Sequence, residues 1–213
     1  MQLTKLGHSC VRLEKDGVAL VIDPGLWSDA ADALSGVSTV LITHEHLDHL
    51  DPGALREALR GDGSLELWAP EPVARQFKEI GGRVHTVGHG DTFTAAGFDV
   101  RVFGREHAVI HPDMPVVPNI GFAVDGVVFH PGDAFTVPDI PVSTLLLPAT
   151  APWLKASEMI DYAREVAPQR AYAIHDGIVN ANGLELMQGL LRFASGRYGI
   201  QYERLEPGTS VEL

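Results

Sequence analysis

The segment Thr43-His44-Glu45-His46-Leu47-Asp48-His49 places four potential metal ligands within one short stretch, directly after the apolar run Val40-Leu41-Ile42. The apolar run predicts a buried strand, and Pro52 predicts the first turn of a helix. The segment therefore forms a strand-to-helix connection that can direct residues 44 and 46 to one metal ion. Residues 48 and 49 then face a second ion, about 3.5–4 Å away in sites of this kind. A solvated histidine-rich turn is the alternative, but this spacing has little other use at neutral pH.

The composition restricts the donors that are available to such a site. Cys10 is the single cysteine of the 213 residues, which excludes an internal disulfide and a zinc site built from several thiolates. The ligands must therefore be histidines and carboxylates. Imidazole and carboxylate suit Zn²⁺, so we expect two divalent ions, with zinc favoured and Mn²⁺ or Fe²⁺ as alternatives.

The net charge of −12 argues against two classes of partner. Non-specific binding to nucleic acid needs positive charge, and an excess of acid also repels anionic lipid surfaces. Bound dications would make the site locally positive, so a nucleic-acid substrate is disfavoured and not excluded. The N-terminal residues lack the apolar run of a signal peptide, and Val18–Ile22 is too short to span a bilayer. We expect a cytosolic protein that does not bind membranes, and the oligomeric state stays open.

Strand-length apolar runs dominate the chain and helical spacing is rarer. Turn signals at Lys15-Asp16-Gly17 and Asp125-Gly126 suit hairpins. The expected strands are Leu3–Leu6, Val11–Leu13, Val18–Ile22, Thr39–Ile42, Leu65–Trp68, Phe98–Phe103, Ile120–Val124, Val127–Phe129, Leu145–Leu147 and Arg170–Ile174. The expected helices are Pro52–Leu59, Pro72–Ile80, Lys155–Val166 and about Leu184–Ala194. This order predicts a single α+β domain over residues 1–213, with sheets packed face to face and helices outside. The proline-rich segment Pro112–Pro118 is expected to be a loop over a site.

The first motif resembles the His-x-His-x-Asp-His pattern of the metallo-β-lactamase superfamily. This resemblance implies the four-layer αββα sandwich and further ligands at later strand ends. His107 follows Phe98–Phe103, Asp133 follows Val127–Phe129, and His175 follows Arg170–Ile174. By this resemblance His107 completes the first metal site, His175 completes the second, and Asp133 bridges both. The implied ligands are His44, His46, Asp48, His49, His107, Asp133 and His175.

Departures from the better-known branches narrow the resemblance. Flavodiiron relatives carry Glu where this chain has His46, so hydrolysis is favoured over redox chemistry. Glyoxalase-type and lactamase-type relatives usually place the third histidine in Thr-x-Gly-His, whereas this chain has Gly-Arg-Glu-His107. The segments Leu6–Cys10, Asp23-Pro24, Ala151–Trp153 and Ile174–Asp176 are similar to a compact bacterial branch that includes ascorbate-6-phosphate lactonase.

Three further residues are candidates for the site. His8 either donates to the substrate or to metal-activated water, or is an ordinary histidine at a strand end. Asp23 either orients a ligand imidazole or forms a turn before Pro24. His111 lies in the proline-rich loop, where contact with the substrate competes with a plain surface role.

Other conspicuous residues are expected to be structural. His130 precedes a proline and is expected to face away from the site, while His85 and His89 are expected at the surface. Trp27 and Trp153 either form walls of the site or, as we favour, pack over the core.

These features predict a metal-dependent hydrolase that acts on a small-molecule ester, lactone or phosphoester. The two ions would lower the pKa of a water molecule, and Asp48 would accept a hydrogen bond from that water while ligating. A phosphodiesterase or nuclease acting on nucleotides or RNA ranks lower because no basic arm is present. A metal-bound sensor without turnover ranks lowest, since all seven ligand positions are filled.

Overall fold

The computed structural model describes residues 1–213, and its strands form two seven-stranded sheets. The first sheet has the order β14 (Ser210–Glu212), β1 (Gln2–Lys5), β2 (Val11–Lys15), β3 (Val18–Ile22), β4 (Thr39–Leu41), β5 (Glu66–Ala69) and β6 (Val84–Thr86). The second has the order β13 (Gln201–Glu203), β12 (Arg170–Ile174), β11 (Thr144–Pro148), β10 (Val128–His130), β9 (Gly121–Val124), β8 (Phe98–Phe103) and β7 (Thr92–Ala95). Both sheets are mixed, with β3 to β6 and β10 to β13 running parallel.

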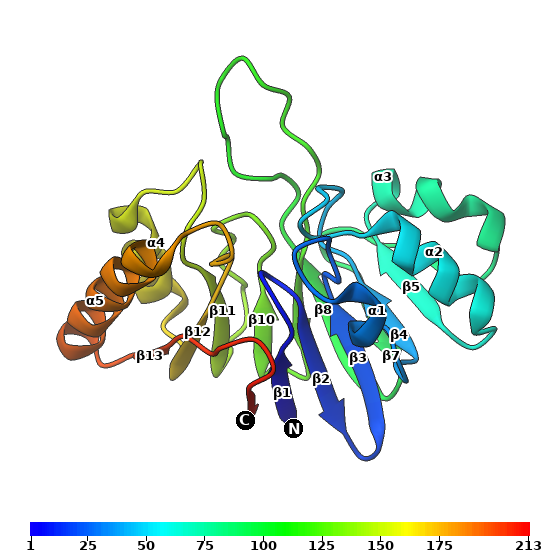
Figure 1. Cartoon of the computed structure of the whole chain (residues 1–213), viewed down its shortest axis with the longest axis horizontal. Helices are drawn as coiled ribbons and strands as arrows, with labels where there is room; N and C mark the ends of the chain where they lie inside the picture. Colours follow the sequence, from blue (N-terminus) through cyan, green and yellow to red (C-terminus); the bar gives the residue numbers. More distant parts are fainter.

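Helices cover the outer face of each sheet (Figure 1). The first sheet carries α1 (Ala30–Ala33), α2 (Pro52–Gly61), α3 (Glu71–Ala74) and the 3₁₀ helix η1 (Arg75–Ile80), and the second carries α4 (Ala156–Val166) and α5 (Ala181–Tyr198). One apolar core lies between the sheets and includes Leu20, Phe122 and Leu146. Two further cores lie beneath the helices of either side. The expected αββα sandwich is confirmed.

Local sequence explains the elements that carry the site. Asp51 caps α2, since its side chain accepts hydrogen bonds from the backbone N–H groups of Gly53 and Ala54. The turns Asp16-Gly17 and Asp125-Gly126 have positive φ at all four residues, as two-residue hairpin turns of this type require. Both expected hairpins are therefore present, between β2 and β3 and between β9 and β10.

The structure differs from expectation at the weaker elements. Strands β6, β7, β13 and β14 were not predicted, because they are short and partly exposed and lack a continuous apolar run. The expected helix Pro72–Ile80 is two pieces, α3 and η1, with a kink at Phe77 (φ −119°, ψ 19°). Phe77 is fully buried, so its insertion into the core takes precedence over a regular helix.

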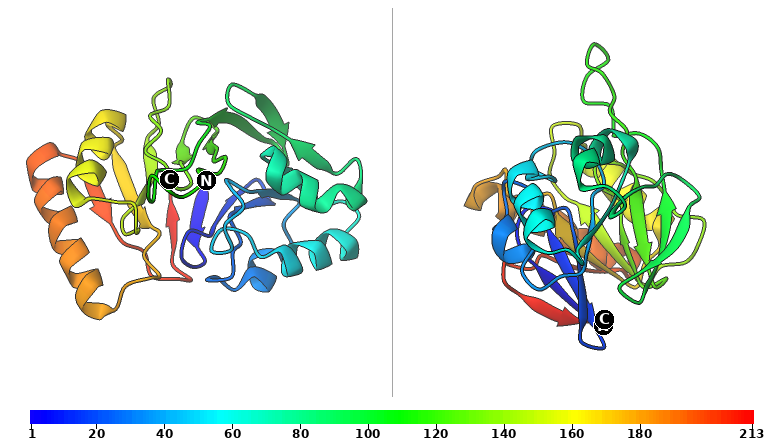
Figure 2. Two further views of the ribbon diagram at one scale, coloured as in Figure 1. Left: turned by 90° about the horizontal axis from the view of Figure 1, so that it is seen from above. Right: turned by 90° about the vertical axis from the view of Figure 1, so that its right-hand side faces the viewer.

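Parallel strands bring the ends that bear functional residues to one edge of the molecule. Asp23 follows β3, His44 follows β4, Asp133 follows β10 and His175 follows β12. The segment between β8 and β9 projects from this edge as a long loop, drawn in green (Figures 1 and 2). The chain ends lie side by side, with β1 paired to β14. No helix reaches the length and apolarity that a membrane span requires.

Candidate metal centre

The seven expected ligands come together at this edge. Their ligand atoms form three overlapping groups, each with all atoms within 4.8 Å of one another. The first group is His44, His46 and His107; the second is Asp48, His49 and His175 together with His8; the third is His44, His49 and Asp133. Because the third group shares His44 with the first and His49 with the second, Asp133 lies between the two.

The ligand atoms approach one another without hydrogen-bond alignment. His49 Nε2 lies 3.0 Å from Asp133 Oδ1, while the Nε2 atoms of His175 and His107 lie 3.0 and 3.3 Å from Asp133 Oδ2. None of these three buried nitrogens has a hydrogen-bond partner. Buried polar atoms without partners are rare in native proteins. Their convergence on one carboxylate is the arrangement that a shared cation explains, so the residues present fit divalent ions.

In three of the candidate ligand rings, the far nitrogen fixes which atom is free to bind metal. The Nδ1 atoms lie 2.6 Å from Asp23 Oδ2 in His49, 2.6 Å from the carbonyl oxygen of Ala108 in His107, and 2.5 Å from that of Thr150 in His175. These oxygens only accept, so each Nδ1 carries the proton and donates. The lone pair of the neutral ring is then on Nε2, which points at the cluster.

Asp23 joins two ligand histidines through one buried carboxylate. It accepts from the backbone N–H of Thr43 at 2.8 Å, from Thr43 Oγ1 at 2.6 Å and from His49 Nδ1. Thr43 Oγ1 in turn lies 3.0 Å from His44 Nδ1 and, having donated its own proton to Asp23, accepts there. Of the two roles considered for Asp23, the structure therefore shows the orientation of ligand imidazoles.

His8 has the opposite arrangement of protons. Its Nδ1 accepts from the backbone N–H of Gly177 at 2.9 Å, so Nδ1 holds a lone pair and Nε2 carries the proton of the neutral ring. The Nε2 atom faces Asp48 Oδ2 at 3.4 Å. His8 thus belongs to the second group by distance but presents an N–H donor to it. Its chemistry is that of a donor beside Asp48, and not of a ligand.

Burial and the contacts within the cluster strongly shift the pKa values of its side chains. Burial lowers the pKa of His44 well below its usual range, so that ring stays neutral. Burial alone would also lower the pKa of His175, but Asp133 and Asp48 outweigh it and raise that pKa to about 9. Burial opposes ionisation of Asp133, yet the neighbouring histidines hold its pKa well below the usual range. Without metal the centre therefore holds ionised carboxylates and protonated imidazole, a charge pattern that bound cations would replace.

A buried ion pair fixes the segment that carries His175. Lys5 Nζ donates to Asp176 Oδ1 at 2.6 Å and to the carbonyl oxygen of Ala173 at 3.1 Å, and Arg204 Nε donates to Asp176 Oδ2 at 2.6 Å. His175 itself has φ 58°, a left-handed backbone that is uncommon outside glycine. These contacts to its neighbours hold the ring at the cluster despite that backbone.

Two tryptophans expected to pack over the core, and one asparagine that sequence reasoning missed, lie close to the centre. Trp153 Nε1 donates to Asp133 Oδ2 at 3.1 Å, so Trp153 is a wall of the centre and not a core residue as favoured. Trp27 packs edge-on against His8 at 4.8 Å and is half exposed. Asn119 is buried and its side-chain oxygen accepts from the backbone N–H of Asp133 at 2.9 Å. Its position just before β9 was its only sequence signal.

The remaining histidines lie outside the ligand set. His130 is buried, with its Nε2 at 2.9 Å from the carbonyl oxygen of Ser9 and its Nδ1 accepting from Gly132, a structural role as expected. His111 is exposed, and its contacts are with Asp113 and Met114 of its own loop. His85 stacks on Trp68 at the far side of the first sheet.

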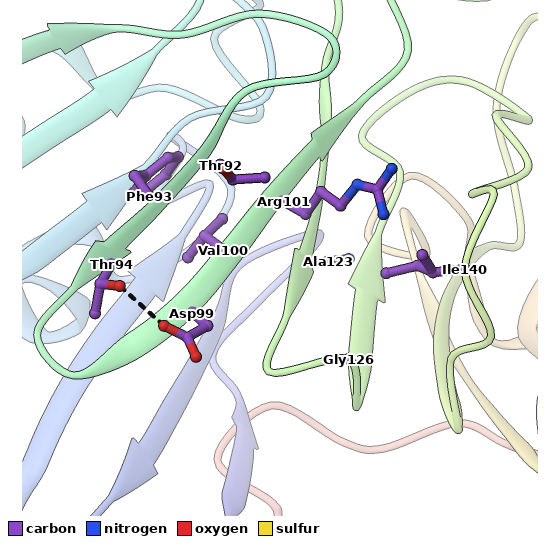
Figure 3. A pocket seen from close by; sticks show the side chains of 9 residues that line it. All are labelled: Thr92, Phe93, Thr94, Asp99, Val100, Arg101, Ala123, Gly126 and Ile140. Atoms are coloured by element: carbon purple, nitrogen blue, oxygen red, sulfur yellow. Dashed lines mark hydrogen bonds between the residues drawn. The ribbon is translucent and has the colours of Figure 1, made fainter.

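A separate cavity of about 400 Å³ lies on the second sheet (Figure 3). Its lining includes Phe93, Arg101 and Ile140, and none of its lining residues belongs to the ligand groups. Thr94 donates to Asp99 at 2.9 Å within it. This cavity holds no converging set of donors comparable with the metal centre.

Comparison with known proteins agrees with the fold. Residues 2–175 match the family described as the beta-lactamase superfamily domain. The chain is 42% identical over 196 residues to Protein Rv0786c of Mycobacterium tuberculosis, covering 90% of this chain and 91% of that protein. It is 31% identical over 117 residues to a UPF0173 metal-dependent hydrolase of Azorhizobium caulinodans, covering 51% and 50%. Among solved structures, Igni18, a metallo hydrolase of Ignicoccus hospitalis, superposes with a TM-score of 0.75 at 21% identity over 99% of this chain and 97% of the other. The chain therefore belongs to the metallo-β-lactamase superfamily of metal-dependent hydrolases.

Proposed function

We propose that this protein hydrolyses a small-molecule ester, lactone or phosphoester with two divalent ions, zinc being the preferred metal. One observation carries the proposal: buried imidazole nitrogens converge on the Asp133 carboxylate from both sides and are left without hydrogen-bond partners. In this proposal His44, His46 and His107 hold one ion, while Asp48, His49 and His175 hold the other. Asp133 is shared between them.

When bound, the ions would supply positive charge that lowers the pKa of a water molecule and polarises the substrate carbonyl or phosphoryl oxygen. The protein contributes the positions of the ligands. Asp23 and the backbone carbonyls hold the imidazoles in the binding tautomer. Trp153 holds Asp133 by a hydrogen bond, and its ring lies about 6 Å from the rings of His107 and His175, where it shields that side of the centre from solvent.

Within the second group, Asp48 is the side chain most open to solvent. It is partly exposed, unlike the buried Asp133, so it is the carboxylate nearest to incoming water. Burial opposes its ionisation, but contacts with His175 and His8 hold its pKa far below the usual range. Asp48 therefore stays ionised and can accept a hydrogen bond from the attacking water, fixing its orientation toward the substrate.

Metal removal and reloading tests this function. Protein stripped with chelator and reloaded with Zn²⁺, Mn²⁺ or Fe²⁺ would be assayed on a panel of esters, lactones and phosphodiesters. Turnover is expected to vanish on stripping, to return on reloading and to be lost in His107→Ala. His111→Ala is the matched control, since His111 lies outside the ligand set. Reloaded protein that binds metal tightly but turns over no member of the panel would instead favour the sensor alternative.

A further inference from the structure

Exposed large apolar side chains gather on the segments that carry the ligands. Leu47 lies between His46 and Asp48, Val109 follows His107 by two residues, and Ile178 follows His175 by three. Each is 41% exposed or more, although aliphatic side chains of this size are usually buried. Trp27, Met114 and Val137 extend the same pattern. These six residues form what we call the apolar rim.

Backbone contacts place the rim segments around the centre. The backbone N–H of Leu26, next to Trp27, donates to the carbonyl oxygen of Leu47 at 2.8 Å. The backbone N–H of Ala108, next to Val109, donates to the carbonyl oxygen of Asp133 at 2.8 Å. The loop bearing Met114 begins at His107 and projects from the same edge (Figure 1). The rim residues therefore lie on segments that border the metal centre or project from the same edge.

The same segments contain no basic side chain. Residues 23–28, 44–51, 107–118, 133–138, 149–153 and 175–180 include neither Lys nor Arg. Lys5 and Arg204, the cations behind the centre, are both bound to Asp176. Arg105 is the nearest basic residue along the chain to a ligand, and it lies ahead of His107, outside the loop. Recognition of phosphate or carboxylate groups usually relies on the Arg guanidinium fork or the Lys ammonium group, and the rim lacks both.

We infer that the substrate is an uncharged ester or lactone with an apolar body that packs on the rim while its carbonyl group reaches the metal centre. The inference rests on the proposed function and narrows its substrate class. An anionic phosphoester would meet the ions, but the other charged side chains on these segments, among them Glu45, Asp51 and Asp113, are all carboxylates. An apolar body of the substrate would cover the exposed side chains and so lower the free-energy cost of their contact with water.

Zinc-loaded protein assayed on a homologous series of p-nitrophenyl esters, from acetate to octanoate, tests this inference. Each added methylene is expected to raise kcat/KM by about twofold to fourfold until the rim is covered. An ester of glutarate, which ends in a carboxylate, is expected to react more slowly than the neutral ester of equal length. Calorimetric affinity for uncharged trifluoromethyl ketones is expected to follow the same dependence on chain length, without turnover.

Variants of the rim give the matched comparison. Val109→Ser and Met114→Ser are expected to flatten the dependence on chain length while metal content stays at the wild-type level. Leu186→Ser and Phe193→Ser are the controls, because these residues are at least as exposed but lie on α5. Those controls are expected to keep the wild-type dependence.

The outcomes separate this inference from the proposed function. Absence of metal-dependent turnover on every ester, lactone and phosphodiester contradicts the proposed function itself. Metal-dependent turnover that favours anionic substrates, or that ignores chain length, overturns the apolar substrate alone. A further result is a rim variant that dissociates a dimer or abolishes vesicle binding while the dependence on chain length stays intact. That result overturns the apolar substrate as well, because the rim then contacts a second copy of the chain or a membrane.

Discussion

Replacing Asp23 by Asn exchanges one carboxylate oxygen for an NH₂ group and changes almost no volume. The Asn side-chain oxygen keeps the acceptor for the backbone N–H of Thr43, which lies 2.8 Å from Asp23 Oδ1. Its NH₂ group takes the place of Oδ2, which accepts from both Thr43 Oγ1 and His49 Nδ1. A donor then faces the donor Nδ1–H of His49. That ring relieves the conflict only by moving its proton to Nε2, where the proton blocks metal binding.

The magnitude follows from the bond that is lost. A hydrogen bond to a buried carboxylate contributes about 1.5–3 kcal/mol, which corresponds to a factor of about 10–150 in an equilibrium constant. Loss of a partner that orients a metal-bound histidine typically weakens metal affinity by about 10–100-fold. We therefore expect Asp23→Asn to weaken the ion held by His49 by about 10–100-fold. The ion held by His46 and His107 is expected to be less affected.

Competition with a chromogenic chelator measures both dissociation constants directly. Asp62→Asn is the matched control, because Asp62 accepts from the backbone N–H and Oγ of Ser64 in the same way but is exposed and far from the ligands. Circular dichroism would establish that both variants are folded. Two wild-type dissociation constants in folded Asp23→Asn would refute the assigned tautomer of His49.

Three further outcomes follow from the same geometry. His8→Asn retains the acceptor for Gly177 but withdraws the donor from Asp48, whereas His8→Gln restores a donor near the Nε2 position. We expect kcat to fall about tenfold or more in His8→Asn and to recover partly in His8→Gln, with metal content unchanged in both variants. Loss of metal from either variant would make His8 a ligand. Gly25→Ala would place a Cβ 2.0 Å from the carbonyl oxygen of Asp48, so the free energy of unfolding should fall by about 1–3 kcal/mol in a thermal unfolding experiment, and metal binding should weaken. Gly63→Ala is the control, because its Cβ meets open space and neither effect is expected. Zinc uptake near pH 7.5 should release at least one proton per chain, because the pKa of His175 in the metal-free protein is raised to about 9. Calorimetry in buffers of different ionisation enthalpy measures this release, and identical heats of zinc binding in all buffers would contradict it.

The raised pKa of His175 also fixes the direction of stability with pH. Its stabilising contribution to the metal-free chain is fully present below about pH 6.5, the value for the unfolded chain, and is lost as pH rises through about 9. Metal affinity runs the other way, because protons compete for the same nitrogen at low pH. The metal-free and metal-loaded proteins should therefore show opposite trends across this window.

The sequence was sufficient to predict which seven side chains come together, because the residues that carry them follow recognisable strands. His44 to His49 lie in one connection, and His107, Asp133 and His175 each follow a buried apolar strand. Strand order then gathers these ends at one edge, which makes the grouping predictable. The sandwich was predictable for the same reason, since its central strands are continuous apolar runs.

Tertiary contacts decide what the sequence left open. The proton position in His8 depends on Gly177, which is 169 residues away along the chain. The role of Asp23 depends on where the fold places the ring of His49, whose Nδ1 it accepts from. From the sequence we favoured a core position for Trp153, because nothing in its segment indicates that its indole reaches Asp133. The edge strands β13 and β14 pair through backbone hydrogen bonds that leave little pattern in side chains.

Anomalous diffraction from crystals of the zinc-loaded protein, recorded on both sides of the zinc absorption edge, tests the central claim most directly. We expect two peaks about 3.5–4 Å apart, with Asp133 contacting both and His107 and His175 on different ions. A single peak, or two peaks of which neither contacts Asp133, would contradict a centre that shares this carboxylate between two ions.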